Sequence, residues 1–102
     1  MGLSIVLETE DGEELARVDD PTNALHRLLP RHDDESYCLV RFIDWEGDTV
    51  FNRIQIPTFL AEWTRLKKGT NDDHDLRLLG QIEKLAERCG EEPHHYLKFY
   101  GD

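Results

Sequence analysis

The sequence lacks several features that mark common classes of protein. Its 102 residues contain only two cysteines, Cys38 and Cys89, which form no CxxC pair, and its seven glycines stand singly, so no glycine-rich phosphate loop is present. No apolar run approaches the roughly 18 residues that a membrane-spanning helix needs. No basic segment followed by an apolar one opens the chain, so we expect no secretory signal. We therefore expect a cytoplasmic protein with two reduced thiols, and the pattern leaves a Cys38–Cys89 disulfide open.

Positive charge is scarce as well. The chain has 12 lysines and arginines against 22 aspartates and glutamates, a formal net charge of -10 at pH 7. Nucleic acids and anionic membranes are bound largely through Lys and Arg, so we expect neither as a partner. A chain this acidic attracts a basic protein by long-range steering. The surplus is uneven, because residues 1–20 carry seven acids against Arg17 alone, a net charge of -6.

Signatures of catalysis and of metal binding are also missing. The two serines lie in no GxSxG context. Cys38 is expected to be a buried, inert strand residue, and Cys89 ends a predicted helix, where the negative end of the dipole raises the pKa of a thiol. Histidines and carboxylates occur together at residues 32–34, 72–75 and 94–95 without ligand spacing, which favours helix capping and solvated loops. We predict no enzyme, no catalytic residue, no metal and no cofactor.

The residues that are present predict a folded α+β protein. Hydrophobic residues, 38% of the total, are spread along the whole chain, which predicts a single domain over residues 1–102. Strand patterns occupy residues 4–9, 15–18, 37–43, 48–54 and 96–100, with an Asp-Gly hairpin turn between the first two. Helical patterns occupy a short stretch after Pro21 and residues 57–69 and 71–90. The order ββαββααβ favours a mainly antiparallel sheet with the helices packed on one face.

Alternation along the strands predicts which side chains face outward. In residues 37–43 we expect Cys38, Val40 and Phe42 to face the helices. The alternate residues are expected to face away from the helices: Tyr37, Leu39, Arg41 and Ile43. In the last strand, Leu97 and Phe99 face inward, and Tyr96, Lys98 and Tyr100 face outward. Such a face is either a docking surface or an ordinary half-solvated sheet. Trp45, in a turn, either folds back onto the core or projects as an anchor.

These observations lead to a hypothesis about function. We predict a small, acidic, non-enzymatic binding protein that acts on a basic protein partner, in the manner of an immunity protein, an inhibitor or an antitoxin. The candidate partner-binding residues combine the acidic surplus with aromatic anchors: Glu10, Asp11, Glu13, Glu14, Asp44, Trp45, Glu46, Tyr96 and Tyr100. Two alternatives are an accessory subunit or homo-oligomer that uses the exposed sheet face, and a metal-binding or hydrolytic enzyme around His94 and His95.

Overall fold

The chain begins with the hairpin that its Asp-Gly pair predicts. In the computed structural model, which describes residues 2–101, strands β1 (Ser4–Thr9) and β2 (Glu14–Asp19) pair antiparallel. Gly12 adopts a φ of 85°, a conformation that glycine reaches without steric cost. Its N–H donates to the Thr9 carbonyl over 3.0 Å, and the Thr9 hydroxyl accepts from the Glu13 N–H over 3.1 Å. The turn is thus closed by local hydrogen bonds.

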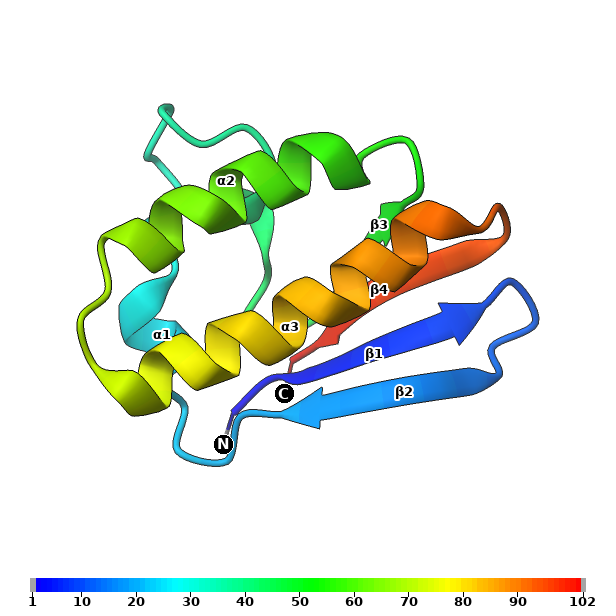
Figure 1. Ribbon diagram of the computed structural model, residues 1–102, viewed down its shortest axis with the longest axis horizontal. Helices are drawn as coiled ribbons and strands as arrows, with labels where there is room; N and C mark the ends of the chain where they lie inside the picture. The colour runs from blue at the N-terminus through cyan, green and yellow to red at the C-terminus, as the bar shows by residue number, and fades with distance from the viewer. Residues whose placement is uncertain (1, 102) are drawn as a thin grey trace.

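The sheet brings the two ends of the chain together. The last strand, β4 (His95–Tyr100), lies between β1 and β3 (Asp48–Asn52), so the strand order is β2-β1-β4-β3 with every neighbouring pair antiparallel. Helices α2 (Ile56–Lys68) and α3 (Asp73–Glu91) lie on the same face of this sheet (Figure 1). The predicted α+β class, with an antiparallel sheet and helices on one face, is confirmed. No helix within residues 2–101 combines the length and the apolar character needed to cross a membrane.

The core fills the space between the sheet and helices α2 and α3. On α2, Phe59 stacks on Trp63 with ring centroids 4.8 Å apart, and both are fully buried. The Trp63 indole N–H donates to the Leu79 carbonyl on α3 over 2.9 Å, so the two helices are joined by a polar bond inside the apolar layer. Helix α3 contributes six buried apolar side chains to this core: Leu78, Leu79, Ile82, Leu85, Ala86 and Cys89.

The first helix is shorter than its sequence pattern indicates. Helix α1 spans Leu25–Leu28 and ends before Pro30. The Asp20 side chain, 2% exposed, accepts from the Ala24 and Leu25 N–H groups over 2.9 and 2.8 Å. Asp20 therefore satisfies the first donors of this helix from a position before its first turn.

Residues 37–43 do not form the predicted strand. They contain a short 3-10 helix, η1 (Val40–Phe42), which stands in the element order where that strand was expected. The cause is Glu62 on α2, whose carboxylate accepts from the backbone N–H groups of Cys38, Leu39 and Val40. Successive N–H groups of a strand point in opposite directions, so three that converge on one carboxylate require a curved chain.

The predicted alternation of residues 37–43 is accordingly wrong, although Val40 is buried as expected. Val40 and Ile43 are both buried, Phe42 is 57% exposed, and Cys38 is also exposed. Two residues expected to face away, Tyr37 and Leu39, instead pack partly buried against the core. The alternation of β4 is confirmed, because Leu97 and Phe99 are buried and its other face is half-buried.

Candidate functional site

The predicted partner-binding residues fall into two groups at opposite ends of the sheet. The hairpin acids Glu10, Asp11, Glu13 and Glu14 lie at the end where Thr9 pairs with His95. The group Asp44, Trp45 and Glu46 lies at the other end, where Ser4 and Asp48 both pair with Tyr100. Strand β1 separates these ends by about 17 to 20 Å. The fold therefore presents two separate candidate surfaces.

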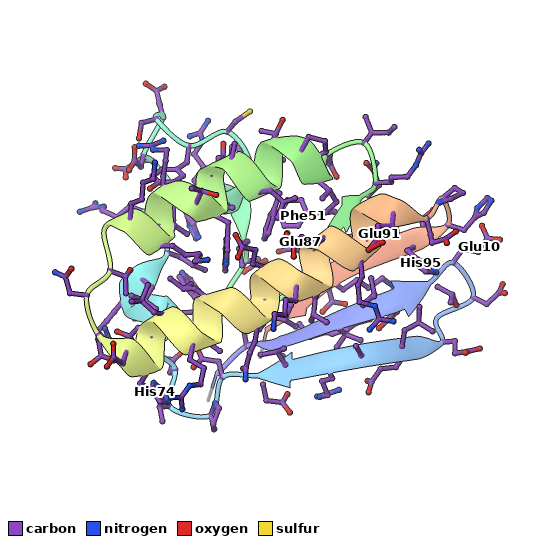
Figure 2. All side chains as sticks on the ribbon, viewed as in Figure 1. Glu10, Phe51, His74, Glu87, Glu91 and His95 are labelled. Carbon is purple, nitrogen blue, oxygen red and sulfur yellow. The ribbon has the colours of Figure 1, made fainter. Side chains whose placement is uncertain are left out.

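The hairpin end gains acids from a distant segment. Because β4 pairs with β1, the last turn of α3 and the loop after it reach the hairpin tip (Figure 1). Figure 2 shows Glu91 at the same end as Glu10, and His94 Nδ1 lies 2.9 Å from Glu10 Oε2, which ties the two segments together. We call the following exposed residues the acidic end: Glu10, Asp11, Glu13, Glu14, Glu91 and Glu92.

Most of the charge at the acidic end is uncompensated by ion pairs. Glu10 contacts His94, and Glu14 contacts Arg17 over 3.1 Å. Within residues 2–101, no ion pair includes the other four members, Asp11, Glu13, Glu91 and Glu92. These carboxylates remain available to a positively charged partner. Sequence reasoning missed Glu91 and Glu92, which only the pairing of β4 with β1 places here.

The opposite end is built as a turn around Trp45. The Trp45 ring is half-buried against the core, with its centroid 4.9 Å from that of His26. The indole thus folds back, which is the first of the two expected arrangements. Asp44 shapes the turn, because its carboxylate accepts from the Glu46 N–H over 2.9 Å. Trp45, His26 and Pro30 line an open depression of about 410 Å³.

The sheet face without helices carries a polar network on top of an apolar residue. Lys98 Nζ lies 3.0 Å from one Glu8 carboxylate oxygen, and the Tyr100 hydroxyl donates to the other. Val6 shares this face with Lys98, its cross-strand partner, and is only 1% exposed. Tyr100 is thus held in place by a hydrogen bond. For the Tyr96 hydroxyl, no hydrogen bond is found within residues 2–101.

The pKa values of this network follow its contacts. Burial raises the pKa of the Tyr100 hydroxyl, and the neighbouring Glu8 carboxylate raises it further. Burial also acts to raise the pKa of Glu8, but the hydrogen bonds from Tyr100 and Lys98 and the Lys98 charge outweigh it, so the pKa lies below its ordinary value. At neutral pH the network therefore holds a carboxylate, an ammonium and a neutral phenol.

The adjacent histidines do not share a binding site. His94 contacts Glu10, whereas His95 belongs to β4 on the side that faces the helices, beside the last turns of α3 (Figure 2). The His95 Nδ1 is buried and has no hydrogen-bond partner within residues 2–101. His94 lies in the turn before β4 at a φ of 70° and contacts the hairpin, whereas the His95 side chain lies on the helix side of the sheet, so the two imidazoles have different surroundings.

A second group of possible ligands does converge, contrary to the expectation from spacing. Ligand atoms of Asp72, His74 and Asp75 lie within 4.8 Å of one another. The Asp75 carboxylate is held by Arg27 through bonds of 3.0 and 3.1 Å, and Arg27 keeps the pKa of Asp75 below its ordinary value despite burial. Asp72 accepts from the Asp75 N–H over 3.0 Å at the start of α3. Helix capping, as predicted, and ion pairing occupy these acids.

The two cysteines differ from each other in exposure. Cys89 is buried, and burial raises the pKa of its thiol to about 11. Cys38 is exposed, so the expectation that it is buried is wrong, because its segment is not a strand. Both thiols are free, which resolves the question of a disulfide between them.

Comparisons of the chain with known protein families, with characterised proteins and with solved structures found no match. Any inference about function therefore has to come from the residues themselves. The fold supplies two starting points for it: an acidic end built from two distant segments, and a sheet face that no helix of residues 2–101 covers.

Proposed function

We propose that the protein is a small, non-enzymatic binding domain that associates with a basic protein partner through its acidic end. The observation that carries the proposal is the convergence of residues 10–14 and 91–92 at one end of the sheet. Carboxylates concentrated in this way attract a basic protein before contact and raise the rate of productive encounter.

Tyr96 supplies the apolar part of the proposed contact. It lies on the sheet face without helices, pairs with Glu8 on β1 and is half-buried. Its cross-strand neighbours Glu8 and Asn52 are polar, and an aromatic side chain flanked by polar residues matches the usual anatomy of an interface, in which a desolvated centre has a polar rim. Tyr100, in contrast, donates its hydroxyl to Glu8, and we assign it to the folded structure.

The chemistry of the described residues supports a role without catalysis. The buried Cys89 thiol, with a pKa near 11, is protonated at neutral pH and is a poor nucleophile. The clustered acids Asp72 and Asp75 are occupied by helix capping and by Arg27. A binding role requires none of these groups to react.

The proposal is tested by capture with two variants of equal net charge. One variant carries Glu10→Gln and Glu13→Gln. The control carries Glu35→Gln and Glu87→Gln, two exposed glutamates that lie outside both candidate surfaces and form no ion pair within residues 2–101. The acids at residues 72–75 are unsuitable as a control because they cap α3 and bind Arg27.

We expect wild type and control to retain the same basic protein from a lysate of the source cells at low salt, and the hairpin variant to lose it. With the retained protein purified, the hairpin variant should associate about tenfold more slowly than the control, and added salt should remove the difference. Equal retention by the two variants would show that the acidic end only keeps the protein soluble.

A further inference from the structure

The outer edge of β2 has unused backbone hydrogen-bonding groups. The Asp20 N–H donates to the Leu3 carbonyl over 3.1 Å, and Val18 is the cross-strand partner of Ile5. Antiparallel strands alternate between residues that bond to the neighbour and residues that point away, so the backbone groups of Arg17 and Asp19 face outward. Within residues 2–101, no backbone group bonds to this edge, and Figure 1 shows β2 along the outer border of the sheet.

The other edge of the sheet is partly closed. The Gly101 N–H donates to the Gly47 carbonyl over 2.8 Å, so Asp48, Val50 and Asn52 point outward from β3. The Asn52 N–H donates to the Gln55 side chain over 2.9 Å, and its carbonyl accepts from the Gln55 N–H over 3.1 Å. Gln55 thus occupies the end of this edge. On the β2 edge, in contrast, no group within residues 2–101 bonds to the outward backbone groups of Arg17 and Asp19.

The charges along β2 determine which charge an incoming strand must carry. Glu13, Glu14 and Asp19 are exposed beside the edge, and the hairpin continues directly into the acidic end. The one cation on β2, Arg17, already binds Glu14 over 3.1 Å and Asp19 over 2.9 Å. A second copy of the chain would bring the same carboxylates to this edge and be repelled, because charged edges oppose self-pairing. A strand rich in Lys or Arg would instead be attracted.

We infer that the outer edge of β2 is the docking site for an extended, basic segment of the partner, which adds to the sheet as a fifth strand. Main-chain hydrogen bonds to Arg17 and Asp19 would hold the segment in register, and its alternate basic side chains would meet Glu14 and the acidic end. This inference rests on the proposed function and specifies its binding mode.

The test uses a defined probe, a short peptide in which lysine alternates with threonine, and a peptide of the same pattern with glutamate in place of lysine. We expect the lysine peptide at low salt to slow hydrogen exchange at the Arg17 and Asp19 amides, and the glutamate peptide to have no effect. Arg17→Pro removes an outward N–H, and Arg17→Ala removes the same side chain but keeps that N–H. We expect Arg17→Pro to bind the lysine peptide about tenfold more weakly than Arg17→Ala.

Four results would overturn the inference. Equal binding by Arg17→Pro and Arg17→Ala, absence of binding, or exchange effects confined to the hairpin tip would exclude the β2 edge as the docking strand. A dimer of the free protein that Arg17→Pro abolishes would replace the basic partner by a second copy. If Arg17→Pro does not fold, the exchange pattern of the wild-type protein decides alone. Failure of this inference is distinguishable from failure of the proposed function, because the capture experiment with the two glutamine variants leaves Arg17 unchanged.

Discussion

Residues 37–43 and the sheet face without helices are each organised by one nearly buried glutamate, but the two carboxylates have different partners. Glu62 and Glu8 are both 7% exposed. Glu62 accepts from backbone N–H groups of three successive residues, whereas Glu8 accepts from the side chains of Tyr100 and Lys98. A carboxylate bound to backbone determines the path of the chain. A carboxylate bound to side chains determines only a surface on strands that are already paired.

The largest effect predicted from this comparison is that of removing Glu62. Glu62→Ala leaves the N–H groups of Cys38, Leu39 and Val40 without their acceptor, and we expect a loss of about 3 kcal/mol in the free energy of unfolding. Glu62→Gln keeps one acceptor oxygen and should lose about half as much. The measurement is urea unfolding at neutral pH, followed by the fluorescence of the buried Trp63 on the same helix.

Glu87→Gln is the matched control for Glu62→Gln. Glu87 is exposed on α3, and such surface changes usually alter stability by less than about 0.5 kcal/mol. If Glu62→Gln and Glu87→Gln unfold at the same urea concentration, the carboxylate does not hold residues 37–43, and the contrast with Glu8 disappears.

An intermediate effect is expected on the sheet face. Tyr100→Phe removes the hydroxyl that donates to Glu8, and we expect it to lower the free energy of unfolding by about 1 to 2 kcal/mol. Tyr96→Phe removes a hydroxyl from the same strand and the same face, for which no hydrogen bond is found within residues 2–101. It should change stability by less than about 0.5 kcal/mol. Equal losses in the two variants would mean that the Glu8 bond contributes nothing specific.

The comparison also explains which parts of the fold could be predicted. The first hairpin, the helix ends at Gly69 and near Gly90, and the alternation of β4 follow from local signals, and all are present. Residues 37–43 alternate as well as any strand, but their N–H groups bind Glu62, far along the chain. One signal was available, because Glu62 lies on the buried face of α2 between Phe59 and Leu66, where a charged residue requires a partner.

The candidate site was predictable in composition but not in arrangement. The charge of the hairpin was visible in residues 10–14, whereas the addition of Glu91 and Glu92 depends on β4 pairing with β1. The separation of Trp45 from the hairpin depends on the same pairing. Local patterns identify strands, but strand order is a long-range property that no short window of sequence contains.

The smallest effect concerns the difference in the free energy of unfolding between wild type and Tyr100→Phe. We expect this difference to change with pH. Because the pKa of folded Glu8 lies below its ordinary value of 4.5, the stability that this carboxylate contributes is present above that value and is lost as the pH falls through the folded pKa. The raised pKa of Tyr100 acts at the other extreme, since its contribution is complete below pH 10 and is lost as the pH rises through the folded pKa.

The measurement is urea unfolding of both proteins from neutral to acidic pH. The two curves of unfolding free energy against pH should converge at the lowest pH values. The other acids with lowered pKa, such as Asp75, destabilise both proteins alike and cancel in the difference. A difference that stays constant down to the lowest pH would mean that Tyr100 is held by something other than the Glu8 carboxylate, and the sheet face would then have no counterpart to the role of Glu62.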